Sequence, residues 1–196
     1  LPAGLTAAWD VTNANNLIFT HPNVGPFIAK QLIQQLVTSN PSPKYVKDVV
    51  AVFNNNGAGV KGDLKATVRA ILLHPEARAP RNPVVSAFGK LKEPVLYVTG
   101  ALRALGAQSD GVDPISRVRA MGQDVYASPT VFNYFQPDET IPGTSVLAPE
   151  FGIHNSNSAV ARTNLVYSLV YSGIAADGNL ANATGTSAIS TKAASA

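Results

Sequence analysis

The 196-residue chain contains no cysteine, which excludes disulfide bonds, thiolate zinc sites and cysteine nucleophiles. Charge is also scarce, because Asp, Glu, Lys and Arg make up 14% of the residues, against about 25% in a typical soluble domain. No apolar run reaches the ~18 residues that span a bilayer, and the opening "LPAGLTAAWD" lacks the charged and apolar regions of a signal peptide. The net charge of +3 is spread without a basic run, so nucleic-acid binding is not expected.

Neutral polar residues, glycine and proline take the place of the missing charges. Such a composition is commoner outside the cytoplasm, so we expect a periplasmic, cell-surface or secreted location. Helix signals dominate the pattern, whereas alternating strand patterns are hard to find. The sequence therefore predicts an all-α, multi-helix domain of six to eight helices over residues 1–172, followed by a low-complexity tail over residues 173–196.

Capping residues and prolines divide the chain into helices. Ser42-Pro43 and Asp63 are typical helix starts. His21-Pro22 and His74-Pro75 should each end a helix, because proline disfavours helical geometry in the residue before it. The predicted helices span residues 13–20, 27–38, 43–53, 64–73, 94–105, 113–121 and 156–172. The first four of them should form two antiparallel hairpins.

The apolar pattern predicts which helix faces are buried. The first helix is expected to start at a cap formed by Asp10 or Thr12. In the second helix, Gln34 and Thr38 belong to the polar face. The apolar stripe opposite it consists of Phe27, Ile28, Leu32, Ile33, Leu36 and Val37. This spacing predicts that the stripe packs into the core.

Residues 123–152 hold prolines and aromatic residues in place of helix signals. We expect a long ordered loop there, because a flexible linker would not carry so many aromatic side chains. The aromatic residues expected to pin this loop are Tyr126, Phe132, Tyr134, Phe135 and Phe151.

Histidine is scarce, with three residues in the chain. His21 in "LIFTHP" and His74 in "ILLHP" each follow an apolar helical run and precede proline. A ligand or general-base role is conceivable for His21. The repeated pattern favours a structural role at a helix end, where a histidine can hydrogen-bond free carbonyls.

Five polar residues in and around the aromatic loop are the candidates for ligand binding: Arg117, Arg119, Asn133, Glu150 and His154. The two arginines could clamp a carboxylate or a sulfate ester. Two residues apart on a helix, however, they point in different directions, and one could pair with Asp124 or Glu150 instead. Glu150 and His154 could bind a metal, but no HExxH or other spaced ligand set accompanies them. No GxSxG motif is present either, so we assign no catalytic residue, metal or cofactor.

Five strings occur in order between Asn13 and Ile153: "LIFTHPNVGPFIAKQLIQQLVTSNPSPKYV", "GVKGDLKATVRAILLHPEAR", "GKLKEPVLYVTGALRA", "RVRAMGQDVYASPTVFNYFQPD" and "LAPEFGI". Together they make the chain resemble the bacterial family called domain of unknown function 1800. The resemblance implies a large exported protein, often encoded beside a second uncharacterised family related to sulfatases, and it implies no established biochemistry. Family members usually begin with helices that carry a motif like "HLLxRATFG" and continue past this chain's end. We therefore expect a middle-to-late segment of a longer protein.

The sequence does not decide whether the chain is catalytic. The leading hypothesis is a non-catalytic scaffold or interaction domain of a larger cell-envelope or extracellular bacterial protein. Its partners would be other proteins or the remainder of its own longer chain. The alternative is part of a hydrolase acting on an extracellular polymer or ester, in which a missing N-terminal half completes the site of the five candidates. A third hypothesis is binding of an anionic polymer, and it would be favoured by one face that holds Lys30, Lys44, Lys47, Lys61 and Lys65.

Overall fold

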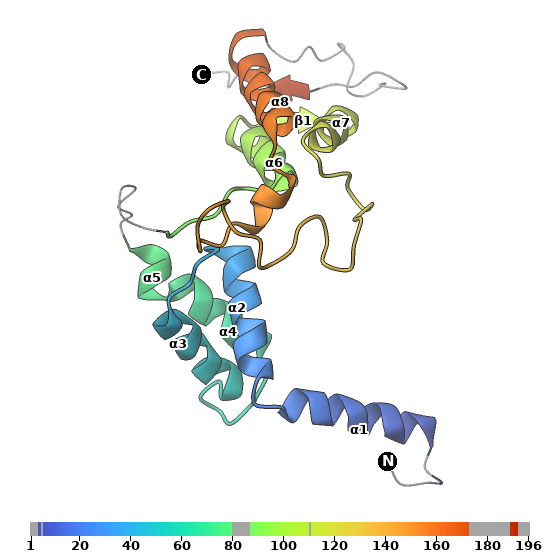
Figure 1. The fold of residues 1–196 in the computed structure, drawn as a ribbon, viewed down its shortest axis with the longest axis vertical. Helices are drawn as coiled ribbons and strands as arrows, with labels where there is room; N and C mark the ends of the chain where they lie inside the picture. The colour runs from blue at the N-terminus through green and yellow to red at the C-terminus, as the bar shows by residue number, and fades with distance from the viewer. Residues whose placement is uncertain (1–3, 5, 80–86, 110, 173–188, 192–196) are drawn as a thin grey trace. The chain divides into compact units, whose positions relative to one another are not determined.

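The computed structural model describes residues 4, 6–79, 87–109, 111–172 and 189–191. Eight α-helices lie in these residues, which confirms the all-α class (Figure 1). The chain divides into two compact units, Leu1–Lys90 and Leu91–Ala196, where the sequence analysis treated residues 1–172 as one domain. The predicted tail lies almost entirely outside the described residues, so its boundary stays a prediction.

Five helices form the N-terminal unit: α1 (Ala7–Thr20), α2 (Val24–Leu36), α3 (Pro43–Asn54), α4 (Leu64–Leu73) and α5 (Pro75–Arg78). The Ser42 side chain accepts a hydrogen bond at the start of α3, and Asp63 does the same for α4, as the sequence predicts. The core of this unit consists of Ala29, Ile33, Tyr45, Val49 and Ile71, from α2, α3 and α4.

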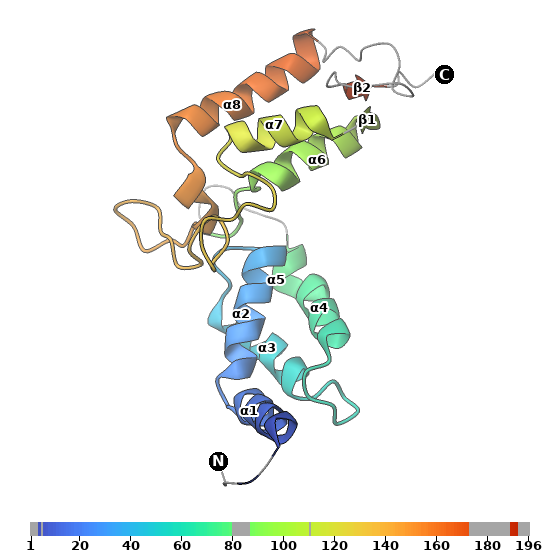
Figure 2. The same ribbon diagram turned by 90° about the vertical axis from the view of Figure 1, so that its right-hand side faces the viewer.

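Helix α1 differs from its prediction in two ways. It starts earlier, because Thr6 is its N-cap and accepts a hydrogen bond from the Trp9 amide. Thr12, one of the expected caps, lies inside the helix and donates to the Ala8 carbonyl (2.9 Å). Helix α1 has no buried residue and extends away from α2, α3 and α4 (Figure 1), and it is seen almost end-on in Figure 2. The predicted hairpin of the first two helices is therefore wrong, whereas α3 and α4 pack together.

The buried face of α2 also differs from its predicted stripe. Phe27 and Leu36, expected in the core, are exposed, whereas Gln34 and Thr38 are buried. Hydrogen bonds satisfy the two buried polar side chains: the Gly89 amide donates to the Thr38 hydroxyl (2.9 Å), and the Gln34 side chain donates to the Ser39 carbonyl (3.1 Å).

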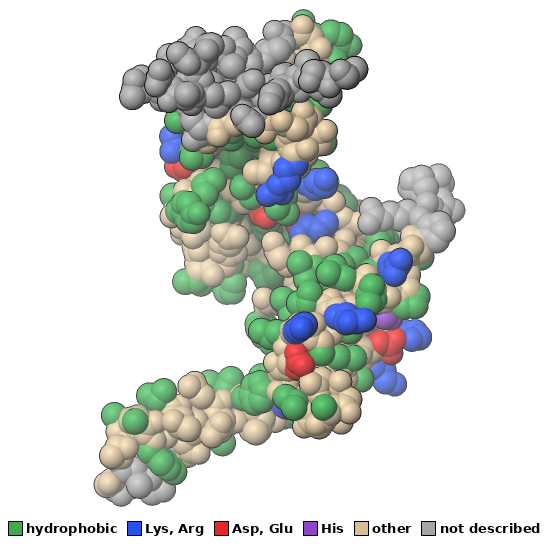
Figure 3. Space-filling model, turned by 180° about the vertical axis from the view of Figure 1, so that it is seen from behind, with side chains coloured by type: hydrophobic (Ala, Val, Ile, Leu, Met, Phe, Trp, Pro, Cys, Tyr) green, Lys and Arg blue, Asp and Glu red, His purple; other side chains and the backbone are tan. Residues whose placement is uncertain are grey.

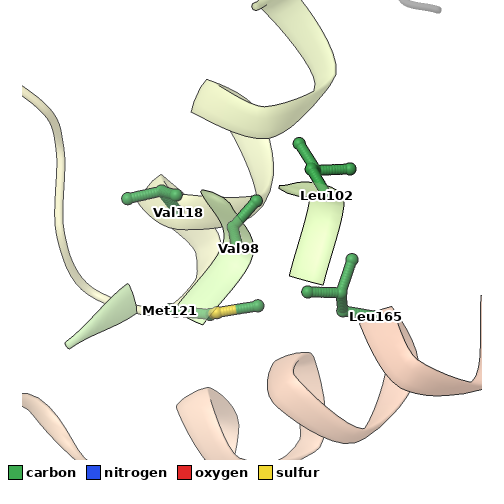
Figure 4. Close-up of a cluster of buried hydrophobic side chains, with 5 residues drawn as sticks. All are labelled: Val98, Leu102, Val118, Met121 and Leu165. Carbon is green, nitrogen blue, oxygen red and sulfur yellow. The ribbon is translucent and has the colours of Figure 1, made fainter. Parts of the chain in front are cut away.

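Three helices dominate the C-terminal unit: α6 (Pro94–Ala104), α7 (Val112–Ala120) and α8 (Ser156–Tyr167). The shorter elements are β1 (Ala107–Ser109), a 3₁₀-helix η1 (Pro149–Ile153), a π-helix η2 (Ser168–Ser172) and β2 (Ile189–Thr191). The two short strands pair antiparallel, with Ala107 opposite Thr191. The core side chains from the three main helices and the residue after α7 converge in Figure 4: Val98, Leu102, Val118, Met121 and Leu165.

The loop between α7 and η1 is pinned by fewer aromatic residues than predicted. The Tyr134 hydroxyl donates to the Asp124 carbonyl, and Phe135 packs against Gly152. Tyr126 and Phe132, in contrast, are exposed. Aromatic content therefore predicts this loop's ordered contacts but not which rings make them.

Candidate functional site

Both His-Pro pairs lie between two helices, as the structural interpretation of His21 predicts. His21 also lines an exposed groove of about 420 Å³, so a ligand role for it stays a prediction. The Nδ1 atom of His21 accepts a hydrogen bond from the Asn23 amide (3.2 Å) at the start of α2. His74 repeats this geometry, with Nδ1 accepting from the Glu76 amide (3.1 Å) in the first turn of α5. Each imidazole therefore bonds an amide of the following helix, where the sequence analysis expected bonds to carbonyls of the preceding one.

His74 makes two further contacts. Its ring stacks on the ring of Tyr45, with centroids 4.2 Å apart, and only 12% of the side chain is exposed. Its Nε2 lies 3.2 Å from a carboxylate oxygen of Asp48. Because Nδ1 accepts an amide proton, neutral His74 carries its own proton on Nε2 and donates it to Asp48. His74 thereby links α3, α4 and α5.

Two groups beside His74 have shifted pKa values. Hydrogen bonds from Lys44 and His74 lower the pKa of the Asp48 carboxyl below its ordinary value. Burial, with a smaller contribution from Glu76, raises the pKa of Tyr45 to about 12. The Tyr45 hydroxyl donates to the Ile71 carbonyl (2.7 Å), which satisfies the hydrogen-bond donor of this buried side chain.

An exposed apolar surface surrounds the junction of α1 and α2. We call it the elbow and define it by Leu17, Ile18, Phe19, Val24, Phe27 and Leu64. Two open grooves of about 420 and 590 Å³ lie here, and Ile18, Val24 and Phe27 line both of them; for this reason we call these three residues the ridge. Ile18 is 65% and Phe27 57% exposed. In Figure 3, hydrophobic side chains are spread along α1 among neutral polar ones, while the rest of this unit shows hydrophobic side chains together with Lys and Arg.

Phe19 joins α1 to the rest of its unit. Its ring lies 6.3 Å from that of Phe53, and the Lys61 ammonium lies 5.2 Å from its centroid. Gly62 has φ +80°, and a Cβ there would lie 2.5 Å from the Phe19 ring. Position 62 therefore requires glycine for both its backbone conformation and its close approach.

The two candidate arginines pair with nearby carboxylates. Arg117 Nε lies 2.5 Å from Asp113 Oδ2, one turn earlier on α7. Arg119 Nε lies 3.0 Å from Asp124 Oδ1, one of the two partners considered from the sequence. These ion pairs hold α7 and the turn after it, which is the structural role that the sequence analysis weighed against ligand binding.

The other three candidates lie in the aromatic loop and at η1. Asn133 is exposed at a turn, with φ +74°, and its amide donates to the Thr130 carbonyl (3.1 Å). Glu150 is buried in η1. His154 Nδ1 lies 3.4 Å from the Ser158 hydroxyl at the start of α8. A ligand-binding role for these residues stays a prediction.

Metal-binding clusters and membrane-crossing helices are both missing from the part of the chain that the structure describes. No group of three or more His, Asp and Glu side chains there could hold a metal ion. No helix there is long and apolar enough to cross a bilayer. The elbow, an exposed apolar surface with two grooves, is our candidate for a functional surface among the described residues.

None of the expectations drawn from the sequence placed a functional surface at the elbow. One signal was present, because Leu17, Ile18 and Phe19 are consecutive and point about 100° apart around a helix. Three such side chains cannot all pack against one neighbouring helix. An apolar run at a helix end, followed by another bulky residue such as Phe27 in the next first turn, therefore predicts an exposed junction.

The described chain is thus an all-α protein of two units, with an exposed apolar elbow on the N-terminal one. A family model described as "Protein of unknown function (DUF1800)" matches residues 2–194, and the chain belongs to this family. This match confirms the resemblance drawn from the five sequence strings. A search of curated proteins found no match, and neither did a search of solved structures.

Proposed function

We propose that the chain is a docking module, a non-catalytic scaffold or interaction domain of a larger exported bacterial protein. The elbow carries this proposal, because α1 has no buried residue and yet presents Leu17, Ile18 and Phe19. Exposed apolar area costs about 25 cal/mol per Å², and contiguous patches of it mark interaction sites. The elbow's occupant would be an apolar segment of another protein or of the remainder of this chain's own longer protein.

The shape of the elbow suits a helical segment. An amphipathic helix presents apolar side chains at i, i+3, i+4 and i+7, so two rows of them can straddle a ridge. The ridge of Ile18, Val24 and Phe27 lines both grooves. Asn15 and Asn16 line one groove and Asn23 the other, which offers neutral hydrogen-bonding groups to the occupant's polar edge.

The low charge supports a location outside the cytoplasm, since 14% of the residues are charged. Fractionation of cells that make the full-length protein tests this part of the proposal. Recovery in the envelope or medium is expected, and recovery in the cytoplasm would contradict it.

A photo-crosslinking residue placed at Ile18 or Phe27 tests the docking role. Leu36 is the matched control, because it is 45% exposed on α2 but lies outside the elbow. One protein should be crosslinked from both elbow positions and not from Leu36. With that protein purified, Ile18→Asp should weaken binding at least tenfold and Leu36→Asp less than twofold.

Two outcomes would overturn the docking role. One is equal crosslinking from all three positions, which indicates random encounters. The other is turnover of an ester or glycan by the purified protein that a single change at Arg117, Glu150 or His154 abolishes, which would establish the hydrolase alternative. The structure offers no support for the hydrolase alternative at Arg117, because its guanidinium Nε already pairs with the Asp113 carboxylate.

A further inference from the structure

A third groove, of about 490 Å³, lies between α2 and α3, separate from the elbow. The α3 side presents Pro43, Val46, Lys47 and Val50, which recur at i, i+3, i+4 and i+7 and so share one helix face. The α2 side presents Lys30 one turn after Pro26. The groove therefore combines an aliphatic and proline lining with two ammonium groups.

The charge of the N-terminal unit is unbalanced around this groove. Residues 1–90 hold nine Lys and Arg but four Asp and Glu, whereas residues 91–196 hold six and eight. Most of the few carboxylates bond within the unit: Asp48 to Lys44 and His74, Asp63 to Asn56 and the α4 amides, and Glu76 to Ser42. Among the described residues, the side-chain ammonium groups of Lys30 and Lys47 have no hydrogen-bond or ion-pair partner. Both ammonium groups can therefore receive an external anion.

The five lysines considered for anionic-polymer binding have different surroundings. Lys44 pairs with Asp48, and Lys61 lies over the Phe19 ring at the elbow. Lys30 and Lys47 alone among the five line the α2–α3 groove. A short anionic segment matches this arrangement better than a long polymer does.

We infer that the α2–α3 groove binds an acidic peptide segment of a partner protein. Its aliphatic side chains would lie on the prolines and valines, and its carboxylates would reach Lys30 and Lys47. No aromatic ring lines the groove, so nucleic-acid bases lack a stacking platform. Sugar hydroxyls would lose water against this apolar lining without replacement hydrogen bonds. A peptide matches both parts of the surface.

This inference rests on the proposed role as an interaction module, but it uses a different surface, so the two can fail separately. A phage-displayed library of random dodecapeptides is selected on the full chain and counter-selected on the Lys30→Glu/Lys47→Glu double variant. Both lysines are exposed, so the variant should fold, and its circular dichroism verifies this. Selected peptides should be rich in Asp and Glu together with Val, Leu and Ile.

The affinity of one selected peptide, measured by fluorescence anisotropy, then tests the site. Lys30→Glu and Lys47→Glu should each weaken binding about tenfold, and rising salt should weaken it further. Lys65→Glu, a charge reversal outside the groove, and Ile18→Asp, a change in the elbow, should each alter affinity less than twofold. A library without acidic enrichment, equal effects of Lys65→Glu and Lys47→Glu, or full displacement by a heparin fragment would overturn the inference. If Ile18→Asp leaves the affinity for the acidic peptide unchanged, this result says nothing about the elbow, which the crosslinking experiment tests separately.

Discussion

The two His-Pro pairs offer a matched test of how one sequence pattern acts in two environments. His21 and His74 each accept a backbone amide two residues ahead, at 3.2 and 3.1 Å. His21 is exposed, whereas His74 is almost buried and stacks on Tyr45. Replacing each histidine by alanine should therefore lower the free energy of unfolding by very different amounts.

The difference follows from the contacts that each change removes. Losing an N-terminal capping acceptor costs about 1 kcal/mol, and losing an aromatic stack costs about 0.5–1.5 kcal/mol more. His74→Ala should therefore destabilise the protein by about 2 kcal/mol, without counting the contact to Asp48, which water screens. His21→Ala loses one exposed capping bond, so about 0.5 kcal/mol is expected.

Urea unfolding of the full chain, followed by circular dichroism, measures these differences. Amide exchange over residues 64–79 verifies that the loss lies in the N-terminal unit. His74→Asn is the control for the cap, because an asparagine side chain can accept the same amide two residues ahead. It should be more stable than His74→Ala. The reasoning is refuted if the two alanine variants lose equal stability, or if His74→Asn is as unstable as His74→Ala.

Three further predictions concern the same unit. Gly62→Ala should displace the Phe19 ring and so loosen the contact of α1 with the rest of its unit. Trp9, the one tryptophan of the chain, lies on α1, so its fluorescence anisotropy decay should show a higher mobility. Gly57→Ala, at φ +93° with open space around it, is the control, and equal mobility in both variants would contradict the mechanism. Tyr45→Phe should cost about 1 kcal/mol through the lost hydroxyl bond. The folded protein should lose the stability that neutral Tyr45 provides as the pH rises from the ordinary tyrosine pKa of 10.0 to the raised value of about 12. Tyr45→Phe removes this contribution, so its stability should fall less steeply over that range. Because the pKa of Asp48 is lowered in the folded state, the stability it adds is present at neutral pH and lost on acidification below about pH 4. Asp48→Asn should make the urea midpoint less dependent on pH there, and an unchanged acid profile would disprove this assignment.

Helix boundaries were predictable where their signals are local. Ser42, Asp63 and Asn155 each cap a helix by accepting an amide three residues ahead, so a short stretch of sequence holds the whole interaction. The pairing of Arg119 with Asp124 was foreseeable for the same reason, since the residues are neighbours along the chain.

Buried faces were less predictable, because tertiary contacts decide them. Gln34 and Thr38 carry polar side chains and still lie inside, where hydrogen bonds with Ser39 and Gly89 satisfy them. The sequence separation of the Thr38–Gly89 bond is 51 residues, and no helical periodicity encodes it. The exposure of the elbow was not predicted for the same reason, because it depends on the direction in which α1 leaves α2.

Because α1 has no buried residue, its own helix stability should affect how tightly a partner binds the elbow. A helix of 14 residues gains little stability in water on its own, and α1 receives no support from buried side chains. Its helical population should therefore rise when the elbow is occupied, so that ordering and association become one equilibrium. Such coupling gives a favourable enthalpy offset by lost conformational entropy and a negative heat-capacity change. Affinity for the elbow would then be adjustable by substitutions on the solvent side of α1 that touch no ligand atom, simply by changing helix propensity.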